Sequence, residues 1–250
     1  MSDDISLLDY LERGGRIASP DNAPARYRAE LMRIMASFVD SELAGAAGFA
    51  DLINEGPGVV ERIVAARIVL EKLGHGERVL KIMGEFGADQ GRYFAAHPWC
   101  ARIERNEDLG AERRVAGDMR LNVFHYPLKS WADAVVMNTL MGKATVIQLT
   151  ELSYCSYQPL ADAFLEILPR EERHADLGRE GLDRLVEQEG AAGDIRALAE
   201  YWRPRVAASF GGADSQRFDL LKRFGLRREK NEALLAEWTG WLDELLASLG

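Results

Sequence analysis

Apolar residues recur every three or four positions along four long stretches of the chain, which is the spacing of one face of an α-helix. The turn sequences NEGPG at 54–58 and SYQP at 156–159 separate neighbouring stretches. No run of alternating apolar and polar residues predicts a sheet. The long helices predicted in this way span about 25–53, 59–86, 131–152 and 160–186.

Shorter elements fill the remainder of the chain. Section 88–127 is rich in charge and predicts short helices and loops, and two further helices are expected at 192–209 and 214–248. No Ser- or Pro-rich linker divides the chain. We therefore predict an all-α, ferritin-like four-helix bundle in a single domain, 1–250, with its core over about 21–188 and additional C-terminal helices over 191–250.

Charged residues interrupt three of the four long apolar faces near their middles. They are Glu42 on the first, Lys72 and His75 on the second, and Glu171 and His174 on the fourth. The third face has Gly142 at the corresponding place. Buried charges need partners, so we expect these side chains to meet in the interior of the bundle.

The interruptions repeat with nearly the same spacing in the two halves of the bundle. Glu42 and Lys72 are 30 residues apart, Gly142 and Glu171 are 29 apart, and a histidine follows three residues after both Lys72 and Glu171. Four-helix bundles use this layout for dimetal sites, in which two helices supply one carboxylate each and two supply Glu-x-x-His. Here Lys72 occupies the place of one glutamate and Gly142 the place of another carboxylate.

Composition limits the partners. The net charge of −9 and the pI of about 5.1 disfavour binding to nucleic acid or to an anionic membrane surface. We find neither a signal-peptide pattern nor an apolar run of about 18 residues, so we expect a soluble, cytoplasmic protein. Cys100 and Cys155 show no ligand spacing, and we expect both to be buried, reduced thiols.

Several short motifs follow one another in a fixed order between about Tyr27 and Gly181. They are SELAG at 41–45, GP at 56–57, LGHG at 73–76, FHYPLKSWAD at 124–133, CSYQP at 155–159, and EERH at 171–174 followed by Gly178. Through this ordered series the chain resembles the PaaA/PaaC family of ferritin-like proteins, the phenylacetyl-CoA epoxidase components. It looks closest to the catalytic PaaA type.

The resemblance implies a ferritin-like fold, a carboxylate-bridged diiron centre that activates dioxygen, an aryl-CoA thioester substrate and a partner subunit of the same fold. The positions that match family ligands are Glu42, His75, Glu171 and His174. Lys72 and Gly142 do not match the family ligands at their positions.

Lys72 admits two interpretations. In the first, it bridges Glu42 and Glu171 in a metal-free polar core, because an ammonium about 4 Å from a divalent ion would be repelled by several kcal/mol. In the second, burial lowers the pKa of Lys72, and its free amine acts as a base or a nucleophile.

A further interpretation keeps one metal ion. Glu42, His75 and Glu171 would hold a single iron, manganese or zinc ion, with His174 as a fourth ligand. Glu71 precedes His75 by four residues, so a shifted register would add another carboxylate.

We expect a component of a phenylacetyl-CoA-epoxidase-like system with a degenerate diiron site, acting in a structural or regulatory role. No cofactor is favoured, and the expected partner is a ferritin-like subunit in a homo- or hetero-oligomer. The alternative is an active metal-dependent oxygenase or oxidase that uses one iron or manganese ion on an acyl-CoA substrate.

Two basic clusters in this acidic chain are candidates for binding the phosphates of coenzyme A, but a solvated or subunit-facing surface is the simpler interpretation of both. They are Arg102, Arg105, Arg113 and Arg114, and Arg203, Arg205, Arg217, Lys222, Arg223, Arg227 and Arg228. Tyr154, Tyr157 and Trp131 are expected either in the core or along a substrate channel.

Overall fold

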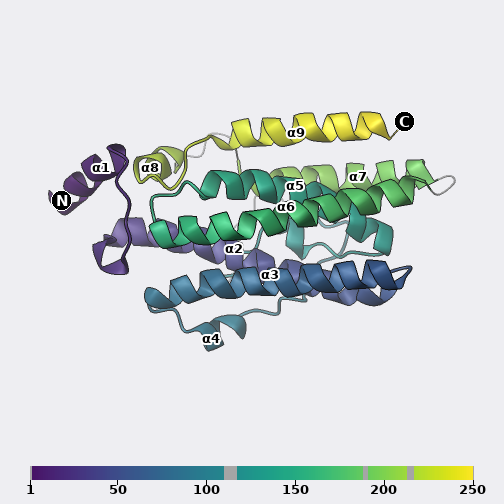
Figure 1. Ribbon diagram of the computed structural model, residues 1–250, viewed down its shortest axis with the longest axis horizontal. Coiled ribbons are helices and arrows are strands. Elements are labelled where there is room, and N and C mark those ends of the chain that lie inside the picture. The colour runs from purple at the N-terminus through teal and green to yellow at the C-terminus, as the bar shows by residue number, and fades with distance from the viewer. Residues whose placement is uncertain (1, 110–116, 188–190, 213–216, 250) are drawn as a thin grey trace.

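The computed structural model describes residues 2–109, 117–187, 191–212 and 217–249 (Figure 1). Within these ranges it contains nine α-helices and no strand, apart from one isolated bridge between Ile17 and Tyr157. The helices are α1 (Ser2–Glu12), α2 (Ala25–Leu52), α3 (Val59–Glu85), α4 (Gln90–Phe94), α5 (Trp131–Leu152), α6 (Gln158–Val186), α7 (Ala191–Ala207), α8 (Phe218–Arg223) and α9 (Asn231–Ser248). The predicted all-α class is confirmed.

The four long helices form two hairpins that pack against each other. Helices α2 and α3 make one hairpin, α5 and α6 make the other, and α3 faces α6 across the bundle. Pro24 precedes α2, and Pro159 lies in the first turn of α6, where its missing N–H costs no hydrogen bond. The ends of these helices lie within about two residues of the sequence prediction. The result is the predicted ferritin-like bundle with extra helices.

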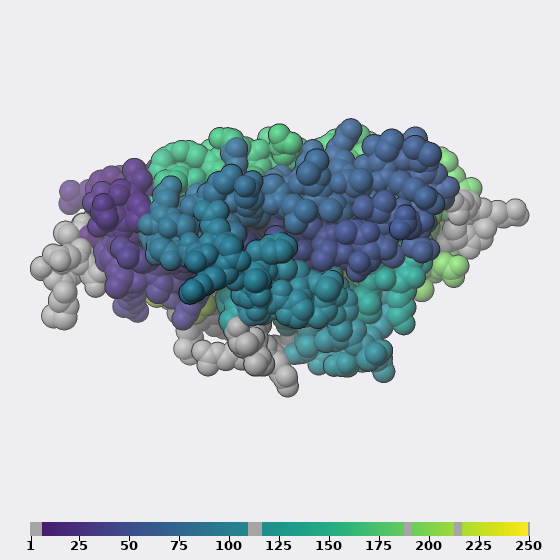
Figure 2. Space-filling model, turned by 90° about the horizontal axis from the view of Figure 1, so that it is seen from below, coloured from purple at the N-terminus to yellow at the C-terminus, as the bar shows by residue number. Residues whose placement is uncertain are grey.

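The additional helices cover one side of the bundle. Helices α7 and α9 pack on α5, while α1 and α8 lie together at the end of the molecule where the chain begins (Figure 1). On the opposite face, α3 and α4 form much of the outer surface (Figure 2). Among the described residues, no helix combines the length and apolar character that crossing a lipid bilayer requires.

Two local expectations were wrong. The helix expected at 214–248 is divided, because the chain turns at Gly225, whose φ of +64° lies in the left-handed region that favours glycine. A Cβ at that position would lie 3.0 Å from Cβ of Ser156, so the turn also packs closely on the loop between α5 and α6. Cys155 is buried as expected, but Cys100 is exposed.

The apolar core falls into two clusters that the interrupting charged residues separate. In α2 the boundary lies between Leu43 and Ala44, immediately after Glu42. In α3 one cluster includes Ile68 and the other begins at Val79. The charged positions therefore lie in a polar layer between two apolar regions of the same bundle.

The long connection between the hairpins is fixed to α2 beside Glu42. Asp40 accepts a hydrogen bond from the backbone N–H of Met119 at 2.6 Å, and Ser41 accepts one from that of Leu121 at 3.0 Å. These bonds hold the connection across the middle of the bundle, and they explain why a polar pair directly precedes Glu42 in a buried helix.

A second buried network joins α5 to α7. The carboxylate of Asp133, 1% exposed, accepts two hydrogen bonds from Arg105, at 2.5 and 3.0 Å, and one from the indole N–H of Trp202 at 2.6 Å. It also accepts the backbone N–H of Lys129 at 2.9 Å. Arg105, expected as a possible phosphate-gripping residue, is thereby held in a contact inside the protein.

Replacing Asp133 by Ala is expected to lower the free energy of unfolding by about 3–5 kcal/mol, because the Arg105 charge and the Trp202 N–H lose their buried partner. Urea denaturation followed by circular dichroism measures the change. Asp183→Ala is the matched control, since Asp183 pairs with Arg179 on the surface and should contribute less than about 1 kcal/mol. Equal losses in the two variants would contradict the account.

Candidate functional site

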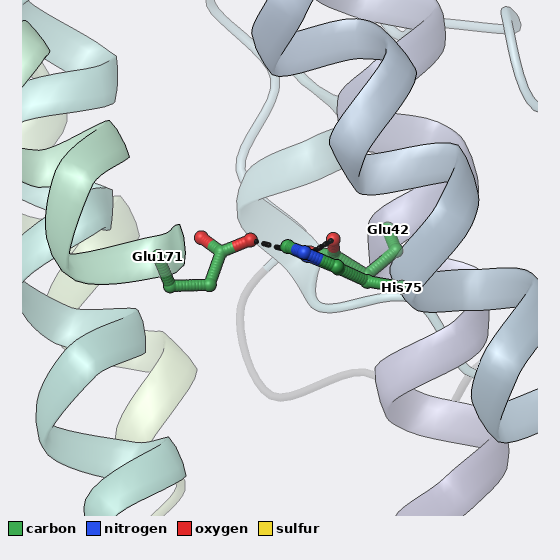
Figure 3. Close-up of side chains that lie close together, drawn as sticks. All are labelled: Glu42, His75 and Glu171. Atoms are coloured by element: carbon green, nitrogen blue, oxygen red, sulfur yellow. Dashed lines mark hydrogen bonds and ion pairs between the residues drawn. The ribbon is translucent and has the colours of Figure 1, made fainter. Parts of the chain in front are cut away.

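The charged side chains predicted to meet do meet in the middle of the bundle. Figure 3 shows Glu171 of α6 opposite His75 of α3 and Glu42 of α2. Lys72 and His174 complete the group, and none of the five side chains belongs to a residue more than 6% exposed. Three helices from both hairpins thus contribute to one charged cluster, as the helical spacing predicted.

Lys72 is the central cation of the cluster. Its Nζ donates to Oε1 of Glu42 at 3.0 Å and lies 3.3 Å from both carboxylate oxygens of Glu171. These contacts reach across the bundle, because Glu42 and Lys72 belong to one hairpin and Glu171 to the other. The side chain of Lys72 therefore joins the hairpins through two charge-assisted hydrogen-bonding partners.

The two histidines flank the same carboxylate. Nδ1 of His75 hydrogen-bonds Oε1 of Glu171 at 2.9 Å and lies 3.4 Å from Oε2 of Glu42. Nδ1 of His174 lies 3.3 Å from Oε1 of Glu171. One oxygen of Glu171 is thus approached by two imidazoles and by the Lys72 ammonium.

Glu71 extends the cluster in a way that the sequence did not predict. A shifted helical register would bring it beside His75 as a further carboxylate, but its Oε2 lies 2.7 Å from Nε2 of His174 on the opposite hairpin. Its other oxygen lies 3.4 Å from Arg170. The side chain of Glu71 is 21% exposed, so it connects the buried cluster to the surface. In the sequence, only the neighbouring opposite charges of Glu71 and Lys72, and of Arg170 and Glu171, indicated that Glu71 could take part in the cluster.

Two glycines determine how the helices approach the cluster. A Cβ at Gly45, one turn after Glu42, would lie 3.1 Å from the ring of Phe124 and 3.7 Å from Cδ of Lys72, so the glycine leaves room for both side chains. A Cβ at Gly142 would lie 3.1 Å from Cα of Ala175. Gly142 therefore lies beside the residue that follows His174, and a side chain at this position would need α5 and α6 to move slightly apart.

Burial and charge act in opposite directions on the pKa values. Burial alone would lower the pKa of Lys72, but the negative charges of Glu171 and Glu42 outweigh it, and the pKa is raised. Burial would raise the pKa of Glu171, yet the charge of Lys72 and the close contacts with His174 and His75 hold it well below its ordinary value. Burial would lower the pKa of His75, but the hydrogen bond to Glu171 and the nearby carboxylate of Glu42 outweigh it, and the pKa is raised.

These directions describe a set of charges that compensate one another. Lys72 stays an ammonium and Glu171 stays a carboxylate over the ordinary pH range. A nucleophilic or basic lysine needs the opposite shift, toward a lowered pKa. The cluster as a whole favours charge pairing at Lys72 rather than a free amine.

The cluster also contains polar atoms with the chemistry of metal ligands. Glu42, His75 and Glu171 each offer one ligand atom, and these atoms lie within 4.8 Å of one another. Oε2 of Glu42, Nε2 of His75 and Nδ1 of His174 are buried without a hydrogen-bond partner. Such atoms are available to a further cation or to a hydrogen-bonding group.

A cavity of about 340 Å³ reaches the cluster from the surface. Glu42, with a side chain 5% exposed, lies on its lining together with the apolar side chains of Phe38 and Met141. Its lining also includes Arg33 and Arg217, whose side chains are about half exposed. The cavity therefore leads from an arginine-bearing opening to one carboxylate of the cluster.

The two predicted basic clusters are dispersed. Arg102 donates to the backbone carbonyl of Ala44 at 2.8 Å, so this residue, like Arg105, has a structural contact. Arg113 and Arg114 lie outside the described residues. In the second cluster only Arg217 and Arg227 line the cavity that reaches Glu42.

The three aromatic residues expected in the core or along a channel lie in different environments. Tyr157 is fully buried and Tyr154 is about half exposed. Trp131 lines a second cavity, on the other side of the cluster along the bundle. None of the three lines the cavity that reaches Glu42.

Replacing Lys72 by Met is expected to lower the free energy of unfolding near pH 8 by about 3–5 kcal/mol, because Glu42 and Glu171 remain buried without their shared cation. The loss should shrink as the pH falls toward about 6, since facing carboxylates have raised pKa values and take up protons that the unfolded chain does not. Urea denaturation at both pH values measures it. Lys81→Met is the control, because Lys81 pairs with Glu77 on the surface.

In the wild-type protein, by contrast, the free energy of unfolding should fall as the pH is lowered into the acid range. The folded-state pKa of Glu171 is lowered, so its contribution to stability is present above the ordinary glutamate pKa of about 4.3 and is lost as the pH falls further.

A Lys72→Met variant as stable as wild type near pH 8 would show that Lys72 does not neutralise a buried cluster.

Comparison with known proteins agrees with the motifs. Over 193 residues the chain is 26% identical to one of the 1,2-phenylacetyl-CoA epoxidase subunits of Escherichia coli (strain K12), a match that covers 76% of this chain. The match spans 57% of that relative, so it extends over little more than half of the relative's length. The whole chain, residues 1–250, matches the family described as phenylacetic acid catabolic protein. The chain thus belongs to the PaaA/PaaC family of phenylacetic acid catabolic proteins.

Proposed function

We propose that this protein is a subunit of a phenylacetyl-CoA-epoxidase-like system in which a buried lysine takes the place of metal, and that its role is structural or regulatory. The observation that carries the proposal is the position of the Lys72 Nζ, within 3.3 Å of carboxylate oxygens from both hairpins. The ammonium does there what a bridging metal ion does in a dimetal bundle, since it holds carboxylates of facing helices together.

A pair of metal ions does not fit the side chains present. A divalent ion about 4 Å from the Lys72 ammonium would be repelled by roughly 8 kcal/mol at an effective dielectric constant near 20. A carboxylate side chain from α5 at position 142 would lie 3.1 Å from Cα of Ala175, so it would need α5 and α6 to move slightly apart. Both carboxylates that remain already contact the Lys72 ammonium, and His75 hydrogen-bonds one of them.

A second candidate function rests on the atoms that lack partners. With Lys72 displaced, the ligand atoms of Glu42, His75 and Glu171 lie close enough together for one iron or manganese ion, and Nδ1 of His174 is free of hydrogen bonds. This arrangement corresponds to a metal-dependent oxygenase or oxidase acting on an acyl-CoA. It requires that the metal compete successfully with the ammonium.

The cavity that reaches Glu42 is the proposed acyl-CoA site. Much of its lining is apolar, which suits an acyl or aryl group, and it also includes Arg33 and Arg217, which pair with Glu30, and Arg227, which pairs with Glu151. Guanidinium groups bind phosphate oxygens through paired hydrogen bonds. The charged part of coenzyme A would thus lie at the exposed arginines and the acyl group near Glu42.

The outer face of α3 is the proposed contact with another ferritin-like subunit. Val59, Val60, Ile63 and Leu70 on this helix are 54–74% exposed, and the helix crosses the face shown in Figure 2. Exposed apolar patches on an otherwise charged surface are typical of subunit interfaces. The proposed partner is a second copy of this chain or a related subunit of the same fold.

Restoring carboxylates should restore metal binding if the cluster is a degenerate dimetal site. We expect the variant Lys72→Glu, Gly142→Asp, Ala175→Gly to bind about two Fe(II) ions per chain, because it supplies four carboxylates and two histidines, and Ala175→Gly removes the side-chain atom that would lie 3.2 Å from a Cβ at position 142. The wild type should bind well under one. Elemental analysis of matched anaerobic preparations measures both.

The matched control replaces Lys72 by Gln and Gly142 by Asn in the Ala175→Gly background. It has similar shape but lacks the two added negative charges, so its metal content should stay near that of wild type. Equal metal content in the wild type and the restored variant would refute the degenerate-site account. Equal contents of about one or more per chain would support the single-metal alternative instead.

The acyl-CoA site makes a separate prediction. Replacing both Arg33 and Arg217 by Ala should weaken the binding of phenylacetyl-CoA by about 10- to 100-fold, because each lost charge-assisted hydrogen bond contributes roughly 1.5–3 kcal/mol before water replaces it. Isothermal titration calorimetry measures the dissociation constant. Arg179→Ala, on the surface of α6, should leave it unchanged. Unaltered affinity in the double variant would place the ligand elsewhere.

A further inference from the structure

We propose that the second cavity, between the two hairpins, is a binding site for a small uncharged molecule with one aromatic ring and a hydrogen-bond acceptor. The cavity has a volume of about 330 Å³ and is lined by all four long helices. Phe49 of α2, Ile68 of α3, Trp131 of α5 and Leu177 of α6 are among its lining residues. It is separate from the cavity that reaches Glu42, and the two share no lining residue.

The cavity lies between the two hairpins, where helices of a bundle ordinarily pack side chain against side chain. Each hairpin is closely packed within itself, and Gly178 of α6 is so near α5 that a Cβ there would lie 2.8 Å from Nδ2 of Asn138. Between the hairpins, at this end of the bundle, apolar side chains instead face an open space. The space opens to the surface beside the exposed residues Pro57 and Glu187, and a concave site of this size with mostly apolar walls is typical of a ligand site.

The second observation is the polar group on the lining. Asn138, 7% exposed, donates one N–H of its side-chain amide to the backbone carbonyl of His174 at 3.1 Å. A side-chain amide has two N–H donors and an acceptor oxygen. Because Asn138 also lines the cavity, its amide is positioned to hydrogen-bond a molecule held by the apolar walls.

Size and charge define the class of ligand. An engineered cavity of about 150 Å³ in another protein accommodates benzene, so a cavity twice as large holds one ring with a short substituent. Glu61, Arg184 and Glu187 are the charged residues on the lining, and their charges sum to −1. This balance disfavours anions, which include carboxylates and coenzyme A thioesters, and the apolar walls disfavour any ion.

The position of the site connects it to the charged cluster. Ile68 lies one helical turn before Lys72, and Asn138 contacts the carbonyl of His174. A molecule in the cavity would touch both hairpins next to the contacts that join them. Binding is therefore expected to stabilise the pairing of the hairpins, whether or not the cluster ever holds a metal.

The test uses the full chain labelled with 5-fluorotryptophan, whose five tryptophans give five fluorine resonances. Trp131→Phe identifies the resonance of Trp131. Benzamide is the probe and benzoate its charged counterpart of nearly equal shape. We expect benzamide to shift the Trp131 resonance saturably, and benzoate to require at least about tenfold higher concentration, because its charge must be desolvated.

Two cavity-filling variants and a control locate the binding. Ala65→Leu and Ala134→Leu enlarge buried residues on the lining and should abolish the benzamide shift. Ala66→Leu enlarges the neighbouring exposed residue of α3 and should keep it. If Ala65→Leu does not fold, as judged by circular dichroism, Ala134→Leu decides. Absence of the shift in wild type, its persistence in the filled variant, or equal binding of benzoate would overturn the proposal.

Discussion

The contact between the Lys72 ammonium and two buried carboxylates is the constraint on which the rest of the bundle depends. An ammonium or a carboxylate removed from water needs a partner of opposite charge, and here each partner comes from a different helix. The three helices must therefore keep a common height and rotation. The apolar core is correspondingly divided at this level, with one cluster on each side of the charges.

Glycines at close helix contacts support the same alignment of the helices. Gly45 leaves space for the aliphatic part of Lys72 beside Phe124, and Gly142 and Gly178 bring α5 and α6 together within the second hairpin. Close packing inside each hairpin contrasts with the interface between hairpins, where charged contacts in the middle are flanked by a cavity on either side. The hairpins thus meet through charged contacts at the centre and through apolar contacts such as that of Phe38 with Phe164, and they leave room for small molecules beside these contacts.

The helices and most of the charged cluster were predictable from the sequence, because helical periodicity is a local property. The four long helices and the convergence of Glu42, Lys72, His75, Glu171 and His174 followed from residues three and four apart. What could not be predicted depends on how helices are rotated against each other. Glu71 lies one position off the apolar face, so only the crossing of α3 and α6 brings it to His174. The contact of Gly142 with Ala175 and the turn at Gly225 depend in the same way on tertiary packing.

The sequence separation of the central contacts bears on the order of events in folding. Short turns join α2 to α3 and α5 to α6, so each hairpin closes a small loop and can form early. Lys72 and Glu171 are 99 residues apart, and their contact needs both hairpins together with the connection between them. The ammonium and the carboxylates therefore remain hydrated until the hairpins dock. A pathway in this order never removes one of these charges from water before its partner has arrived.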